Sequence, residues 1–213
     1  MKTDDLLDLL ASDRAAVPRN AAARGLALAL SVGAMLAAGL MVLFYGVRSD
    51  LTQAVQLPMF WVKLLVPIAV CTAGFVQCHR LARPGVGVGL TWLAMALPLG
   101  GLWILAAAVW QAAPASERSG LVWGNSWVTC SVSIAALSLP AFVAGLLALR
   151  QLAPTRRAGA GAAVGAMAGG LAAGVYALHC TELAAPFLAV WYVAGMAVPV
   201  AFGALLGQRY IRW

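Results

Sequence analysis

Two cysteines that lie fifty residues apart, Cys130 and Cys180, are the side chains in this sequence best suited to do chemistry. Cys180 directly follows His179 and stands two residues before Glu182, between two hydrophobic stretches. Cys130 closes the polar run 124–130, which also contains Asn125. Thiolates and imidazoles bind soft and borderline metal ions, and two thiols can instead form a disulfide. These residue types therefore indicate a metal site or a redox switch.

The spacing of the two cysteines leaves the choice between these chemistries open. They do not form a C-x-x-C motif, so a thioredoxin-type relay has no local support. Two thiolates favour Cu(I), with Zn(II) and other thiophilic ions as alternatives. His179 is the candidate third ligand, although adjacent side chains often point apart, and Glu182 and Asn125 are weaker candidates. Two unrelated thiols are the remaining alternative.

The other two cysteines fall within one hydrophobic stretch, and the expected role of each is structural. Cys71 lies in the middle of that stretch, where a thiol is usually a small packing residue. Cys78 and His79 stand at its end beside Arg80, a cation that can lower the pKa of a thiol. In a reducing compartment, Cys78 is nevertheless expected to remain a free thiol.

The composition places all of these residues in a membrane protein. The chain is 63% hydrophobic and only 10% charged, whereas a soluble domain carries about 25% charged residues. Apolar runs of roughly 20 residues recur, each long enough to cross the hydrocarbon core of a bilayer. With so few polar residues left over, the spans must be helices that satisfy their own backbone hydrogen bonds. We expect an all-α domain over 25–207 with six transmembrane helices, at 25–47, 59–76, 86–110, 129–149, 158–178 and 187–206.

The basic residues predict the orientation of this domain. Eleven of the fourteen precede the first span or follow an even-numbered one, and basic residues stay on the cytoplasmic side of a membrane. Both termini, including the tail 208–213, are therefore expected on the cytoplasmic side. We attribute the net charge of +7 to this topology and to contact with lipid headgroups. Direct binding of nucleic acid is not expected. The cytoplasmic set is Lys2, Arg14, Arg19, Arg24, Arg80, Arg83, Arg150, Arg156, Arg157, Arg209 and Arg212.

This topology puts Cys130 and Cys180 on the same outer side of the membrane, with Arg48 and Arg118 in the outer loops. Lys63 is the one charge inside a span, and we expect it to reach outward to the membrane surface. No acidic residue lies in the middle of a span, which disfavours a proton- or ion-coupled transporter. Motifs for nucleophilic catalysis, phosphate binding or metalloproteases are also missing, so an enzyme is not expected.

Glycines at helical spacing mark the fifth span as a packing element. Gly161, Gly165 and Gly169 fall four residues apart, as do Gly170 and Gly174. Small residues at this spacing allow helices to approach closely. We expect a central helix packed on its neighbours, with a homodimer interface as the alternative.

Residues 1–24 form the one polar segment long enough to bind a cytoplasmic partner. Thr3 can cap a short helix that places leucines on one side and aspartates on the other. An acidic polar face disfavours docking on anionic lipid, so the leucines are expected to enter a groove of a partner protein. A frayed chain end is the alternative. The candidate partner-binding residues are Asp4, Asp5, Leu6, Leu7, Asp8, Leu9 and Leu10.

Over its whole length the chain resembles the NrsF-type anti-sigma factors, six-helix proteins of the bacterial inner membrane. The resemblance rests on the order and spacing of short blocks: MKTDDLL at 1–7, PMFWVK at 58–63, RLARPG at 80–85, SWVTC at 126–130, LAPTR at 152–156, ALHC at 177–180, APF at 185–187, Trp191-Tyr192, Gly195-Met196 and Arg212-Trp213.

The resemblance implies a function for both ends of the domain. Such proteins hold an extracytoplasmic-function sigma factor through the amino-terminal segment, here Asp4 to Leu10. They release it when a heavy metal, copper or another periplasmic stress engages two outer cysteines, here Cys130 and Cys180. No permanent cofactor is implied, only a regulatory Cu(I) or other thiophilic ion. The rivals are a small transporter or metal exporter using the same cysteines, and a membrane thiol oxidoreductase.

Overall fold

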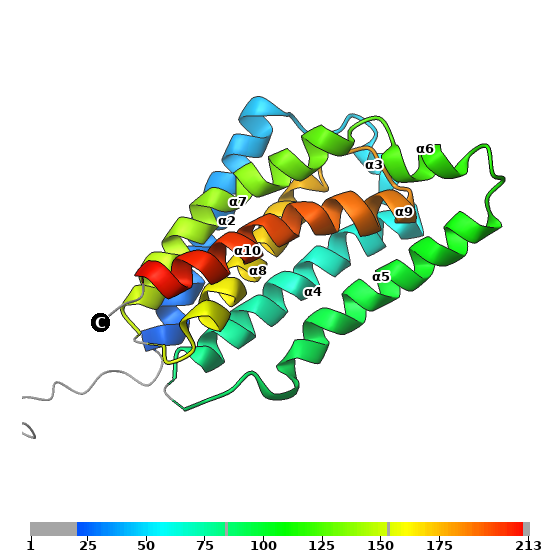
Figure 1. The fold of residues 1–213 in the computed structure, drawn as a ribbon. Helices are drawn as coiled ribbons and strands as arrows, with labels where there is room; N and C mark the ends of the chain where they lie inside the picture. Colours follow the sequence, from blue (N-terminus) through cyan, green and yellow to red (C-terminus); the bar gives the residue numbers. More distant parts are fainter. Residues whose placement is uncertain (1–20, 84, 153, 211–213) are drawn as a thin grey trace, which may run out of the picture.

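The computed structural model describes residues 21–83, 85–152 and 154–210, and within them the secondary structure is entirely helical. Six long helices run roughly alongside one another (Figure 1). Each is long and apolar enough to cross a membrane, which confirms the expected all-α architecture with six candidate spans. They are α2 (Ala21–Phe44), α4 (Pro58–Leu81), α5 (Leu93–Ala112), α7 (Trp127–Arg150), α8 (Arg157–Tyr176) and α10 (Val193–Tyr210).

Short helical pieces connect these spans. α3 (Leu51–Ala54) lies between α2 and α4, and the 3₁₀ turn η1 (Gly89–Trp92) leads into α5. α6 (Arg118–Trp123) precedes α7, and α9 (Ala185–Phe187) continues through the π-helical turn η2 (Leu188–Tyr192) into α10. Single π-helical turns are rare and occur frequently at functional sites. This one lies beside the cysteine-bearing turn at 177–184.

Helix α8 lies at the centre of the bundle, as its glycines predict. A methyl group at Gly161 would overlap the carbonyl of Gly203 on α10, and one at Gly165 would overlap the carbonyl of Pro199. On the other side, Gly170 lies against the backbone of Cys71 on α4. The glycine face thus serves contacts within the chain, where small residues bring backbones together.

Helix α5 lies at the edge of the bundle (Figure 1). Of its residues, only Leu102 and Ala106 are buried, whereas Leu97 and Ile104 are strongly exposed. An apolar surface of this kind suits a helix surrounded by lipid chains.

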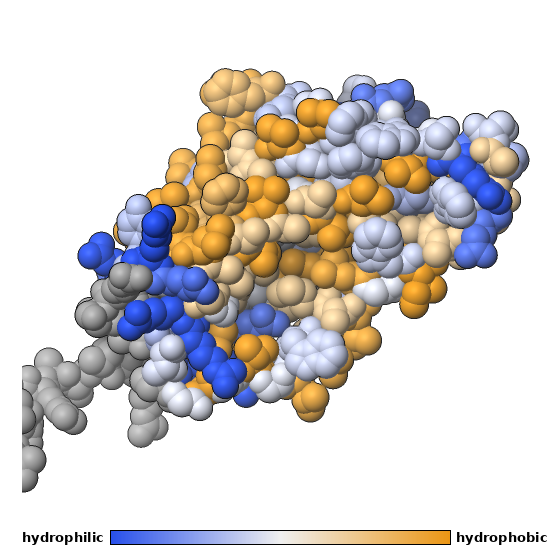
Figure 2. Space-filling model, in the orientation of Figure 1, coloured by the Kyte–Doolittle hydropathy of each residue, from blue (hydrophilic) through white to orange (hydrophobic). Residues whose placement is uncertain are grey.

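The connections alternate between the two ends of the bundle. The loops that follow α2, α5 and α8 lie at one end, and those that follow α4 and α7 lie at the other end with the finish of α10 (Figure 1). Figure 2 shows hydrophobic residues along the sides of the long helices and a group of hydrophilic residues near the end where α10 finishes. In the following text, the end with the 177–184 turn is called the cysteine end and the opposite one the arginine end.

Candidate functional site

The structure brings Cys130 and Cys180 together at the cysteine end. Cys130 lies in the first turn of α7, and Cys180 lies in the turn that joins α8 to α9. The two thiols are close enough to interact directly with each other. Both side chains are free thiols and almost fully buried, with 0% and 4% of their surface exposed. Two thiols fifty residues apart in sequence thus form one buried pair.

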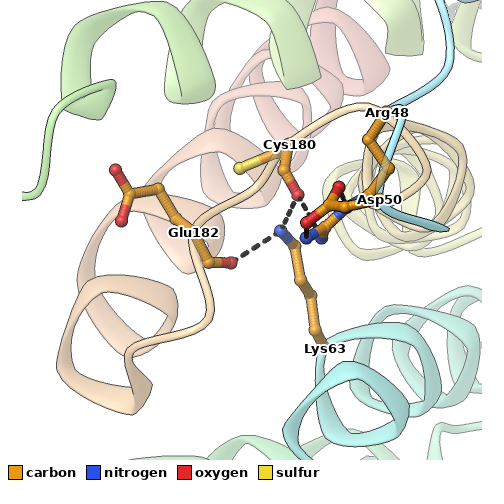
Figure 3. A network of polar contacts seen from close by, with 5 residues as sticks. All are labelled: Arg48, Asp50, Lys63, Cys180 and Glu182. Atoms are coloured by element: carbon orange, nitrogen blue, oxygen red, sulfur yellow. Dashed lines mark hydrogen bonds and ion pairs between the residues drawn. The ribbon is translucent and has the colours of Figure 1, made fainter. Parts of the chain in front are cut away.

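Lys63 of α4 reaches into the same turn (Figure 3). Its Nζ donates to the carbonyl oxygens of Cys180, at 2.6 Å, and Glu182, at 2.7 Å. Only 2% of Lys63 is exposed, so the prediction that it reaches out to the membrane surface is wrong. The physical reason is that the turn after α8 presents carbonyls without helical partners, and these solvate the ammonium group in place of water.

Arg48 approaches the Cys180 carbonyl from the segment that follows α2. Its Nη1 donates to that oxygen at 3.1 Å, and its backbone N–H donates to the Leu178 carbonyl at 3.1 Å. Asp50 holds the guanidinium with two hydrogen bonds of 2.7 Å, a bidentate geometry that fixes its orientation. These bonds lower the pKa of Asp50 below its usual value. They raise the pKa of Arg48 above its usual value.

The surroundings of Cys180 favour its thiolate form. The hydrogen bond from the Cys130 thiol is the largest cause that lowers the pKa of Cys180, and the Lys63 ammonium adds to the effect. The backbone N–H of Glu182 lowers the pKa of Cys180 in the same direction. A thiolate is the form that binds metals and attacks electrophiles. Cys180 is therefore the more reactive member of the pair.

His179 points away from the two thiols. Its Nδ1 lies 3.0 Å from the Gly46 carbonyl oxygen, and its ring packs near those of Tyr45 and Tyr176, with centroids 5.3 and 5.4 Å away. Within the described part of the chain, no group of three or more His, Cys, Asp and Glu side chains is placed to hold a metal ion. The structure thus places the two cysteines together and the histidine elsewhere.

The weaker candidates Glu182 and Asn125 contact each other. The Glu182 Oε1 accepts a hydrogen bond of 2.8 Å from the Asn125 backbone N–H, and in Figure 3 the carboxylate extends away from Cys180. This bond ties the 177–184 turn to the segment that leads into α7. It links the two chain segments that carry the cysteines.

Tyr176 and Tyr192 are buried in one hydrophobic cluster with the pair, and Trp191 packs against that cluster. Lys63 Nζ lies 5.1 Å from the ring centroid of Tyr192, whose buried hydroxyl has no hydrogen-bond partner of good geometry among the described residues. Trp191 packs against Trp127, with ring centroids 4.7 Å apart, and against Trp123, at 5.3 Å. Its Nε1 also donates to the Val122 carbonyl at 2.8 Å.

Arg48, Asp50 and Lys63 are site residues that the sequence pattern did not reveal. The available signal was the position of Lys63, a charge within a span near its outer end. A charge in that position is costly unless it is paired. The carbonyls that it would meet could not be assigned from sequence.

The remaining predicted residues lie apart from this site. Cys71 and Cys78 are buried in α4, and the His79 ring lies near Arg83 at the arginine end. The segment from Asp4 to Leu10 falls outside the described residues. Its role therefore stays a prediction.

Comparisons with known proteins identify the family. The NrsF profile, described as a negative regulator of sigma F, matches residues 10–213. The chain is 44% identical to the probable anti-sigma-F factor NrsF of Azospira oryzae and 38% identical to the anti-sigma-F factor NrsF of Caulobacter vibrioides, in each case over the full length of both proteins. No solved structure matches. The predicted resemblance is confirmed, and the chain belongs to the NrsF family of negative regulators of sigma F.

Proposed function

We propose that this protein is an anti-sigma factor that binds an extracytoplasmic-function sigma factor at the cytoplasmic face of the bacterial inner membrane. It releases the sigma factor when a thiophilic metal or an oxidant engages Cys130 and Cys180. Membership of a family of negative regulators gives the chain a regulatory, non-enzymatic role. The observation that carries the sensing proposal is the buried pair of free thiols assembled from two distant segments.

The donor set suits a soft ion of low coordination number. Thiolates select Cu(I), which two sulfur ligands can hold, whereas structural Zn(II) takes four ligands. Among the described residues, no third His, Cys, Asp or Glu side chain joins the pair. Cys130 and Cys180 would thus hold Cu(I) through both sulfurs and give up their remaining thiol protons.

Oxidation is the second chemistry open to the pair. Hydrogen peroxide can oxidise the two thiols to a disulfide, with the loss of two protons and two electrons and the formation of two water molecules. The thiolate character of Cys180 suits it as the attacking sulfur, with Cys130 as the resolving thiol. Both chemistries would draw the 177–184 turn and the start of α7 into a new arrangement.

The proposed orientation follows from the arginines. Arg80, Arg83, Arg150, Arg156 and Arg157 lie in the connections at the arginine end or in the helix turns next to them. The positive-inside rule assigns that end to the cytoplasm, where the sigma factor is found. The thiol pair then faces the periplasmic side. A regulator in this orientation can report an outside signal to an inside partner.

Serine substitution tests the sensing proposal. In cells, Cys130→Ser and Cys180→Ser should each abolish induction of a sigma-dependent reporter by copper while repression without copper stays intact. Cys78→Ser, a buried cysteine outside the pair, is the matched control and should respond as the wild type does. Persistent induction in both Cys130→Ser and Cys180→Ser would refute a sensing role for the pair.

Charge insertion tests the proposed partner-binding segment. Leu6→Asp combined with Leu10→Asp should free the sigma factor without any inducer, because the charges prevent leucine burial in a groove. Ala15→Asp combined with Ala16→Asp adds the same charge outside the leucine cluster and should retain repression. The measurement is the fraction of sigma factor that sediments with the membranes. An unchanged fraction in the leucine variant would exclude this segment as the binding site.

A further inference from the structure

Residues 178–180 of the turn that carries Cys180 are hydrogen-bonded to the segment that directly follows α2. The Gly46 carbonyl lies 3.0 Å from the His179 Nδ1, and the Arg48 N–H donates to the Leu178 carbonyl at 3.1 Å. The Arg48 side chain then donates to the Cys180 carbonyl at 3.1 Å. Three successive residues of the turn are thus hydrogen-bonded to residues 46–48.

Burial and an ion pair keep this contact in place. Arg48 is only 8% exposed, and the bidentate contact with Asp50 fixes the plane of its guanidinium. The Cys180 carbonyl receives a second cation, Lys63, from α4 (Figure 3). Charge-assisted hydrogen bonds of this kind are roughly twice as strong as neutral ones. A displacement of the Cys180 backbone therefore has to move or break its contact with Arg48.

Helix α2 connects this contact to the opposite end of the bundle. It runs without proline from Ala21 to Phe44, about 36 Å at 1.5 Å per residue. Its residues Ala29, Ala37 and Met41 are buried, and the helix packs mainly on α7. The start of α2 is joined by the chain to residues 1–20, which contain the proposed partner-binding segment. An uninterrupted helix transmits a shift or rotation from one end to the other.

We infer that Arg48 is the positioning residue that couples the Cys180 turn to α2, so that a rearrangement of the thiol pair displaces α2 and with it the attached amino-terminal segment. This inference rests on the proposed function, since it supplies the route between the proposed sensor and the proposed output. A ligand shifts such an equilibrium only through its different affinity for the two arrangements. The bonds of the Cys180 carbonyl are the contacts that differ between them.

The Arg48→Gln variant tests whether Cu(I) binding at the thiol pair can be separated from release of the sigma factor. The full-length protein in membrane vesicles, with its sigma factor bound, is titrated with Cu(I) under anaerobic, reducing conditions. Two quantities are followed: protection of Cys130 and Cys180 from a thiol-alkylating reagent, and the fraction of sigma factor released. In Arg48→Gln the Cu(I) concentration for half-release should rise about tenfold or more, within the usual range of coupling between sites, while thiol protection stays unchanged.

Two further variants provide the comparison. Arg48→Lys keeps a cation and should restore part of the response. Arg118→Gln removes an arginine at the same end of the bundle that bonds to the carbonyls of Ala113 and Gln111, and it should behave as the wild type does. If the Arg48→Gln variant releases half of its sigma factor at the same Cu(I) concentration as the wild type, the inference is overturned.

The design distinguishes this result from failure of the proposed function. If the wild type retains its sigma factor at saturating Cu(I), or Cys180→Ser releases it normally, the sensing proposal fails and the inference falls with it. If Arg48→Gln does not accumulate in membranes, Asp50→Asn takes its place. That variant keeps the guanidinium but frees its orientation, so half-release should shift in the same direction by a smaller factor. An unchanged Asp50→Asn response would then overturn the inference.

Discussion

At the arginine end of the bundle, α8 and α10 touch backbone to backbone, whereas at the cysteine end aromatic side chains separate the same chain segments. Gly161 meets Gly203 directly at the first end, while Tyr176 and Tyr192 lie with ring centroids 6.3 Å apart at the second. Backbone contact leaves no side chain to rearrange. The cysteine end is instead held by hydrogen bonds from Lys63 and Arg48 to a turn, and these can be exchanged. The bundle thus combines a fixed end with an adjustable one.

The largest expected effect comes from breaking the fixed end. Gly161→Ala places a methyl group into the carbonyl of Gly203, and because both backbones are helical the overlap cannot be relieved by a side chain. The cost should be about 3 kcal/mol, at the upper end of the usual range for overpacking. Gly174→Ala on the same helix is the control, since a methyl group there meets nothing within 4 Å. The measurement is reversible unfolding of the detergent-solubilised protein.

An equal loss of stability in both glycine variants would contradict the distinction between the two ends. The expected change for Gly174→Ala is within about 0.5 kcal/mol, as for substitutions that touch no packed neighbour.

A smaller effect is expected from the adjustable end. Lys63→Met keeps the aliphatic stem but leaves the Glu182 carbonyl without its donor and the Cys180 carbonyl with only Arg48. The free energy of unfolding should fall by about 2 kcal/mol, which is the order of cost for an unsatisfied buried acceptor. Arg150→Met removes an exposed cation at the arginine end and should cost less than about 0.5 kcal/mol.

The measurement is thermal unfolding of Lys63→Met and of Arg150→Met, each compared with the wild type. If Lys63→Met were as stable as Arg150→Met, the carbonyl contacts of Lys63 would make no net contribution to holding the turn.

The smallest expected effect concerns the ion pair beside the turn and its pH dependence. The hydrogen bonds from Arg48 lower the pKa of Asp50 below its ordinary value of about 3.9. The contribution of the Asp50 carboxylate to stability is therefore fully present when the pH is above its ordinary pKa. It is lost as the pH falls through the lower pKa that Asp50 has in the folded protein. Asp50→Asn should lower the Tm slightly and by a constant amount from about pH 5 to 8. A difference that grows or reverses across that range would show that another group controls the pair.

The sequence pattern predicted the parts of the structure that hydropathy and charge determine. The six apolar runs became the six long helices, and the alternation of basic residues matches the ends at which the loops lie. The glycines of the fifth run indicated its central place, since Gly161 and Gly165 can only serve close backbone contact. These features follow from residue type and spacing alone.

The details of the site depend on backbone atoms that carry no residue-specific signal. Lys63 is buried because the carbonyls of Cys180 and Glu182 turn toward it, and any residues in those positions would offer the same oxygens. The direction of His179 likewise depends on the Gly46 carbonyl and on the rings beside it. Such contacts arise from the path of the 177–184 turn, which periodicity does not encode.

The indoles packed together at the cysteine end give the protein an intrinsic optical reporter. Trp127 stands one helical turn before Cys130, and it is packed against Trp191, whose neighbour in the chain is Tyr192. A heavy ion bound by the thiols shortens the excited-state lifetime of indoles in its vicinity, and a shift of the turn alters their mutual coupling. Quenching of the native emission during a metal titration would therefore follow occupancy of the pair without any added label.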